Sequence, residues 1–143
     1  MIAFLFAGQG AQKPGMGKQL YDHSAAARAV FDTVSDALGR DMCRLCFESE
    51  PGELNLTRNA QLALYTVDLA AAAALAEQGI QAGMCAGFSL GEYPALVYAG
   101  ALSLTEGAKL VEKRSAFMAE CEGGKMAAVI GLDAPEVALA CEK

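Results

Sequence analysis

Short apolar runs alternate with longer stretches of helical periodicity along this chain. The runs at 2–6, 82–87 and 125–130 are short, mainly apolar and next to glycine, which is typical of buried strands. Strands that alternate with helices indicate an α/β fold with parallel strand pairing. Helical patterns, with apolar residues three and four positions apart, cover about 22–38, 42–47, 57–78, 90–98, 103–121 and 133–143.

Polar residues and breakers mark where several of these helices begin. Ser103 is followed three residues later by Glu106, which is the pattern of a capping box. The stretches 7–16 and 49–52 are rich in glycine, proline and polar residues, and they predict a loop and a turn. Candidate caps of two further helices are Asp22 or Ser24 and Asn55 or Thr57.

The composition adds limits on the class of protein. The 143 residues are 54% hydrophobic and only 20% charged, which indicates one core-rich domain with apolar surface that another element covers. The net charge of −6 argues against a nucleic-acid partner, because phosphate binding needs clustered lysine and arginine. We find no apolar run of about 18 residues that predicts a membrane span. The apolar N-terminus lacks the basic region of a signal peptide, so we expect a cytoplasmic protein.

Five cysteines raise the question of redox or metal chemistry. Cys43 and Cys46 form a C-x-x-C pair, but the pair lies within a helical pattern and no second pair follows. With His23 as the only histidine, a four-ligand zinc site is poorly supported, and we expect no metal. We interpret the pair as reduced structural thiols, buried or half-buried. The same interpretation applies to the remaining cysteines, Cys85, Cys121 and Cys141.

The sequence Gly87-Phe88-Ser89-Leu90-Gly91 is the strongest candidate for catalytic chemistry. It is a G-x-S-x-G motif between a predicted strand and a predicted helix, where glycines permit a sharp turn that exposes the serine hydroxyl. At the start of a helix, free N–H groups can stabilise negative charge. Ser89 is therefore a candidate acyl-accepting nucleophile. The alternative is a glycine-bounded turn with a structural serine.

Two further positions fit a site around Ser89. Gln9 lies between two glycines after the first strand, where its backbone N–H can serve as an oxyanion donor or simply form part of a glycine-rich turn. Arg114 shares a helix face with Leu110 and Phe117. An arginine on an apolar stripe either extends its charge to solvent, forms an internal ion pair, or clamps a carboxylate substrate.

A general base for Ser89 is missing from the sequence. His23 lies at a predicted helix start beside Asp22, so we expect an exposed or capping role for it. No pair of Asp followed by His lies downstream of Ser89, as an esterase of the α/β-hydrolase type requires. A serine hydrolase is also disfavoured because Arg114 suits an acyl group that carries a carboxylate.

The segments 6–12, 87–93 and 110–114 together resemble the malonyl-CoA:acyl carrier protein transacylase family, and the acyltransferase domains of polyketide and fatty acid synthases are similar. The resemblance implies a ping-pong transfer of malonyl from coenzyme A to the phosphopantetheine thiol of acyl carrier protein, with no cofactor. It implies that Ser89 is the nucleophile and that Arg114 binds the malonyl carboxylate. Gln9 and the backbone N–H of Leu90 would form the oxyanion hole.

The family fold also implies a division of the chain. Residues 1–124 would be the N-terminal part of an α/β-hydrolase-like large subdomain, and 125–143 the first strand and helix of an inserted ferredoxin-like subdomain. Phe88 stands where the family usually has histidine, which predicts altered packing or substrate preference. The family continues to a catalytic histidine that this sequence does not contain. We therefore expect a C-terminal half or a second polypeptide to supply it; the alternatives are a polyketide acyltransferase domain or a non-catalytic fragment.

Overall fold

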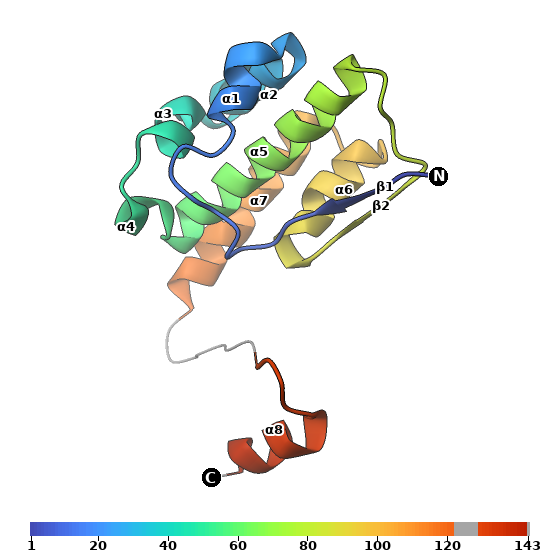
Figure 1. Cartoon of the computed structure of the whole chain (residues 1–143). Coiled ribbons are helices and arrows are strands. Elements are labelled where there is room, and N and C mark those ends of the chain that lie inside the picture. The colour runs from blue at the N-terminus through green and yellow to red at the C-terminus, as the bar shows by residue number, and fades with distance from the viewer. Residues whose placement is uncertain (122–128, 143) are drawn as a thin grey trace.

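A parallel pair of strands lies beside a group of packed helices in the computed structural model, which describes residues 1–121 and 129–142 (Figure 1). Strand β1 (Ala3–Phe6) pairs in parallel with β2 (Met84–Gly87), and Ala3 lies opposite Met84. The strands predicted at 2–6 and 82–87 are confirmed with slightly shorter bounds, as is their parallel pairing. The mixed α/β class follows from this arrangement.

Five helices connect the two strands. They are α1 (Lys18–His23), α2 (Ala25–Leu38), α3 (Met42–Phe47), α4 (Pro51–Leu54) and α5 (Thr57–Glu77). After β2 the chain forms a 3-10 turn, η1 (Ser89–Gly91), and then α6 (Glu92–Tyr98), α7 (Leu104–Glu120) and α8 (Ala134–Cys141). The order confirms the predicted alternation of strands and helices.

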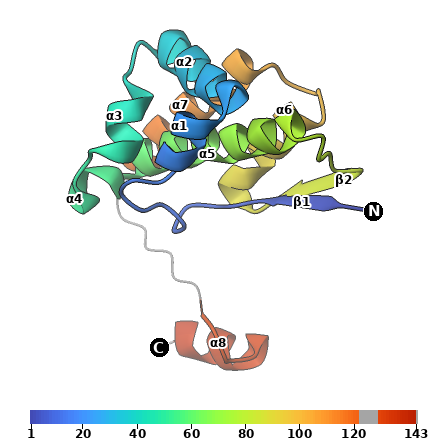
Figure 2. The same cartoon turned by 45° about the horizontal axis from the view of Figure 1, so that its top comes forward.

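Helix α5 is the centre of the packing. Every residue from 59 to 66 is buried, so two successive turns of this helix are enclosed by neighbours on all sides. Figure 2 shows α5 running between α1 and α2 on one side and the sheet on the other, with α7 behind it. The Tyr65 hydroxyl in this enclosed segment donates a hydrogen bond to the Leu104 carbonyl over 2.7 Å, which ties α5 to the start of α7.

The helix ends show which capping predictions hold. The Ser103 hydroxyl accepts from the Glu106 N–H at 3.2 Å and the Glu106 carboxylate accepts from the Ser103 N–H at 2.9 Å, so the capping box is confirmed. Ser24, rather than Asp22, caps α2 by accepting from the Ala27 N–H at 3.0 Å. Asp22 instead pairs with Lys18 within α1.

Three local predictions were wrong. The short helix α1 lies mostly before the helix predicted at 22–38, where no element was expected, and α4 occupies part of the turn predicted at 49–52. Neither Asn55 nor Thr57 caps α5, which begins after Leu56 without a side-chain cap. The side chains of Asn55 and Thr57 are instead acceptors for Gln12 at 2.8 Å and Gln9 at 3.5 Å, so they hold the loop after β1.

The cysteine prediction holds in the core and fails at the surface. Cys46 is buried and Cys43 is half-buried, and burial raises the pKa of the Cys46 thiol to about 12, which makes it unreactive. Cys121 and Cys141 are exposed, contrary to expectation. They lie at the ends of α7 and α8, where fewer elements pack against them.

The expected ferredoxin-like start at 125–143 is not tested by the structure and stays a prediction. Of the strand predicted at 125–130, residues 125–128 lie outside the described residues, and Val129 and Ile130 are not in a strand. The helix predicted from 133 is present as α8, capped by Asp133. Within the described ranges α8 buries none of its residues and lies apart from the other helices in both views (Figures 1 and 2).

Within residues 1–121 and 129–142, we find no helix with the length and apolarity needed to cross a membrane.

Replacement of Gly107 by alanine tests the packing of α7 on α5. A Cβ at this position would overlap the Tyr65 hydroxyl and lie 2.8 Å from Val97. We expect Gly107→Ala to lower the free energy of unfolding by about 1–3 kcal/mol, as overpacked cores do, measured by urea denaturation. Gly52→Ala is the control, since a Cβ there meets no atom within 4 Å. Equal stability of the two variants would contradict this account.

Candidate active site

Ser89 occupies a strained turn directly after β2. Its φ of +53° makes it the one non-glycine residue in the described part of the chain with a left-handed backbone. Such a conformation is costly for a residue with a Cβ, and it recurs where a serine nucleophile is held at a strand-to-helix turn. The side chain is exposed at the start of η1. The backbone therefore presents the hydroxyl as the motif predicted.

The two glycines of the motif are required by close backbone contacts. A Cβ at Gly87 would overlap the backbone of Gly91, and a Cβ at Gly91 would overlap the carbonyl of Phe6 at the end of β1. The turn after β2 is therefore folded tightly upon itself and pressed against β1. This confirms the expectation that the glycines remove Cβ atoms from a sharp bend.

Arg114 reaches Ser89 from α7. Its Nη2 donates a hydrogen bond to the Ser89 Oγ over 2.9 Å, and its guanidinium lies 5.7 Å from the centre of the Tyr93 ring. Arg114 is half-buried, and among the described residues no carboxylate lies within salt-bridge distance of it. The internal ion pair that the sequence left open is therefore not formed. A cation is held beside the serine with its charge uncompensated.

Gln61 is a site residue that the sequence reasoning missed. Its side chain is fully buried in α5, where its Oε1 accepts from Arg114 Nη1 at 2.5 Å. Its Nε2 donates to the Gln9 Oε1 at 3.2 Å and to the Met118 sulfur at 3.3 Å. Gln61 thus joins the arginine to the loop after β1. The available signal was a glutamine among apolar residues on an enclosed helix, since buried amides need partners.

The two proposed oxyanion donors lie on either side of the nucleophile elbow, which is the sharp turn at residues 87–91. Gln9 follows β1, and the adjacent Gly8 packs so closely on Phe88 that a Cβ on it would lie 2.7 Å from the Phe88 carbonyl oxygen. Leu90 is the second residue of η1, where helical N–H groups lack partners within the helix, and its side chain is fully buried. The arrangement brings both segments to Ser89. The oxyanion role itself remains a prediction.

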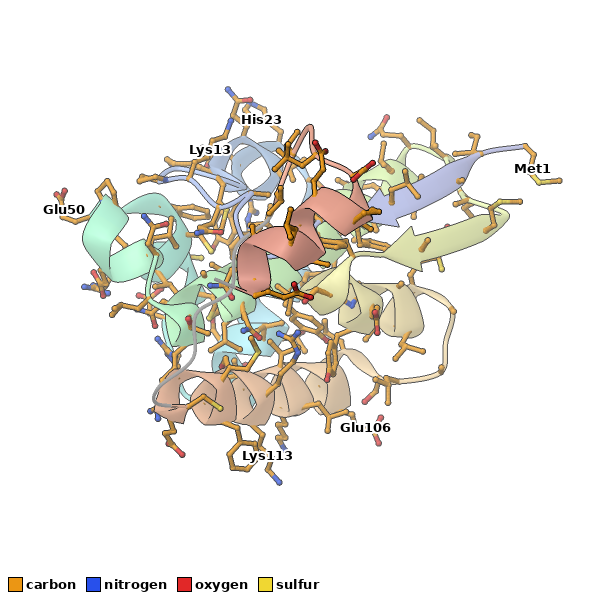
Figure 3. The ribbon with its side chains drawn as sticks, turned by 90° about the horizontal axis from the view of Figure 1, so that it is seen from below. Met1, Lys13, His23, Glu50, Glu106 and Lys113 are labelled. Atoms are coloured by element: carbon orange, nitrogen blue, oxygen red, sulfur yellow. The ribbon has the colours of Figure 1, made fainter. Side chains whose placement is uncertain are left out.

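No described residue is placed to act as the base for Ser89. His23 is exposed at the end of α1, and its Nδ1 contacts the Gln19 carbonyl oxygen at 2.9 Å. Figure 3 shows His23 at one margin of the molecule and Lys113 of α7 at the opposite margin. Arg114 donates to the serine and cannot accept its proton at neutral pH. Among the residues described, no cluster of His, Cys, Asp and Glu is arranged to hold a metal ion.

Comparison with known proteins identifies the class to which this fold and site belong. Residues 3–143 match the family described as the acyl transferase domain, and the chain belongs to that family. Within it, the sequence resembles part of a malonyl-CoA:acyl carrier protein transacylase. The malonyl CoA-acyl carrier protein transacylase of Bacillus subtilis strain 168 is 48% identical over 136 residues, which are 93% of this chain and 43% of the relative.

Two other matches extend this likeness. A polyketide biosynthesis malonyl CoA-acyl carrier protein transacylase of Bacillus velezensis is 42% identical over 96% of this chain and 47% of its own length. A solved malonyl-transacylase in complex with a type II polyketide synthase acyl-carrier protein has a TM-score of 0.88 and 36% identity, over 98% of this chain and 47% of that one. This chain therefore spans about half the length of the relatives it matches.

Replacement of Gln61 by leucine tests the buried hydrogen bonds at the site. The similar shape of leucine preserves packing but leaves Arg114 Nη1 without its acceptor and Gln9 Oε1 without its donor. We expect Gln61→Leu to lower the free energy of unfolding by about 1–3 kcal/mol, measured by urea denaturation. The matched control is Gln81→Leu at an exposed position. A Gln61→Leu protein as stable as this control would show that the hydrogen bonds are unimportant.

Proposed function

We propose that this chain is the nucleophile-bearing half of a malonyl-CoA:acyl carrier protein transacylase of fatty acid biosynthesis. In this proposal it works in the cytoplasm, and malonyl-CoA is a substrate in a reaction without a cofactor. The observation that carries the proposal is the hydrogen bond from Arg114 to Ser89. An uncompensated guanidinium beside a serine in a nucleophile elbow suits an acyl group that ends in a carboxylate.

The proposed reaction has two transfers. The Ser89 Oγ attacks the thioester carbonyl of malonyl-CoA, an ester bond forms, the carbon–sulfur bond breaks, and coenzyme A leaves with the proton taken from the serine. The phosphopantetheine thiol of acyl carrier protein then attacks the ester and restores the serine hydroxyl. Both steps pass through a tetrahedral oxyanion, for which the backbone N–H groups of Gln9 and Leu90 are the proposed donors.

Arg114 has one role in the proposed resting state and another with substrate bound. Its two terminal nitrogens contact Ser89 and Gln61 at 2.9 and 2.5 Å. The two oxygens of a malonyl carboxylate can accept hydrogen bonds from the planar guanidinium of Arg114. We propose that the bound carboxylate replaces the serine as the hydrogen-bond acceptor, so that the serine hydroxyl is free to attack. Gln61 would keep the side chain aimed at the serine throughout.

The proton transfer requires a base from outside the described residues. We propose that a polypeptide corresponding to the other half of the domain supplies a catalytic histidine, in line with the 43–47% of the relatives' length that this chain spans. The likeness to a polyketide transacylase supports an alternative in polyketide synthesis. In the second alternative the chain is a fragment that keeps the elbow and performs no catalysis.

Replacement of Arg114 tests the proposed substrate. We expect Arg114→Ala to lower the ratio of kcat/KM for malonyl-CoA to kcat/KM for acetyl-CoA by about 10- to 100-fold, because hydrogen bonds between charged groups are lost with malonyl alone. The assay measures acyl transfer to acyl carrier protein. It uses this chain mixed with the portion of the Bacillus subtilis transacylase that this chain does not match.

Arg28→Ala is the matched control, because Arg28 is an exposed arginine that also lies over a tyrosine ring. It should leave the malonyl-to-acetyl ratio unchanged. An unchanged ratio in Arg114→Ala would remove the carboxylate role. Absence of transfer by the unsubstituted pair would favour the non-catalytic fragment.

A further inference from the structure

The loop after β1 contains a tight turn that carries Gln9. The Gly8 carbonyl accepts from the Ala11 N–H at 3.4 Å, which closes a four-residue turn with Gln9 and Gly10 at its centre. Gly10 has a φ of +117°, and the third residue of a type II turn needs such a positive φ. The Gln9 N–H takes no part in closing the turn, and among the described residues it donates to no backbone carbonyl.

The closing bond of this turn is weak, and the Gln12 side chain supplies a shorter one. Backbone hydrogen bonds are commonly about 2.9–3.0 Å long. The Gln12 Oε1 accepts from the Gly10 N–H at 2.8 Å. This N–H and the Gln9 carbonyl belong to one planar peptide unit and point in opposite directions. Because type I and type II turns differ in the direction of this central peptide, the bond to Gln12 selects one of the two.

Gln12 is itself held by Asn55. The Gln12 Nε2 donates to the Asn55 Oδ1 at 2.8 Å, where the loop passes the start of α5 (Figure 1). Asn55 follows α4, and its backbone N–H donates to the Pro51 carbonyl at 3.0 Å. The two bonds of Gln12 need an acceptor and a donor in one side chain, which an amide provides. The central peptide of the turn is therefore tied to the helical part of the fold.

The turn also lies against the nucleophile elbow. Gly8 is buried, and a Cβ on it would lie 2.7 Å from the Phe88 carbonyl oxygen. The Gln9 side chain is held at both ends, since its Nε2 donates to the Thr57 Oγ1 at 3.5 Å and its Oε1 accepts from Gln61 at 3.2 Å. The side chain of Gln9 and the peptide that follows it thus have separate anchors. Oxyanion donors are effective when they are fixed before the reaction begins.

We propose that Gln12, supported by Asn55, is a positioning residue for acyl transfer, which fixes the backbone at Gln9 and so holds the Gln9 N–H toward the tetrahedral oxyanion. The inference rests on the proposed function, because it takes this N–H as an oxyanion donor. Neither Gln12 nor Asn55 contacts the acyl group in this proposal. The oxyanion exists only during the reaction, so loss of the anchor slows the chemical steps and leaves substrate binding intact.

Replacement of Gln12 by alanine tests the positioning role in the acyl-transfer assay described above. We expect Gln12→Ala to lower kcat about tenfold with KM unchanged, which is less than the loss of about 100-fold or more when an oxyanion donor is removed. The factor should be the same for malonyl-CoA and acetyl-CoA, because the oxyanion forms with either acyl group. Gln19→Ala, at an exposed position on α1, is the matched control and should keep its kcat.

Two isosteric changes separate the hydrogen bonds from side-chain packing. In Asn55→Asp an oxygen still accepts from Gln12, and in Gln12→Glu the Asn55 amide can turn to donate. Each change alone should lower kcat about twofold or less, so two independent effects would give about fourfold at most. The double variant Gln12→Glu/Asn55→Asp places two carboxylates where the 2.8 Å bond was, and we expect it to lose about tenfold.

Backbone order parameters of the 143-residue chain alone give a readout that needs no catalysis. NMR relaxation should give an order parameter S² of about 0.85 for the Gly10 N–H in the unsubstituted chain and below about 0.6 in Gln12→Ala. Asn55→Asp should keep the higher value. An unchanged S² in Gln12→Ala would overturn the anchor. A loss of activity that falls on KM, or on malonyl-CoA alone, would overturn the positioning role.

These measurements distinguish the inference from the proposed function. Absence of transfer by the unsubstituted mixture would count against the proposed function alone, and the Gly10 order parameters would still decide whether Gln12 fixes the turn. A mixture that transfers malonyl with full kcat in Gln12→Ala would overturn the inference and leave the proposed function standing.

Discussion

The hydrogen bonds of Gln61 hold together the segments on which the candidate site depends. This buried amide contacts Arg114 of α7 on one side and Gln9 of the loop after β1 on the other. Arg114 in turn contacts Ser89 after β2. Because the enclosed turns of α5 fix Gln61, the position of the arginine is set by the core of the fold and not by a flexible surface.

The electrostatics of the site follow from this arrangement. Arg114 is half-buried and faces an amide, a hydroxyl and an aromatic ring, none of which neutralises its charge. A cation in such surroundings is stabilised when an anionic ligand arrives. Among the described residues, none is placed to act as a base for Ser89.

Local patterns predicted much of this structure. The glycine spacing around Ser89 defines a turn within five residues, and helical periodicity places Arg114 on the inner face of α7, so both were readable from the sequence. Gln61 was missed because its partners Gln9 and Arg114 lie 52 and 53 positions away. The predicted cap of α5 was wrong because the side chains of Asn55 and Thr57 accept hydrogen bonds from the loop after β1.

We propose that Ser89 receives the acyl group. The most direct test incubates this chain with malonyl-CoA and with the portion of the Bacillus subtilis transacylase that this chain does not match, and quenches the mixture in acid. The peptide that contains Ser89 is then analysed by mass spectrometry. We expect a malonyl ester on Ser89 that disappears when acyl carrier protein is added. A malonyl adduct on another residue, or transfer that persists in Ser89→Ala, would contradict it.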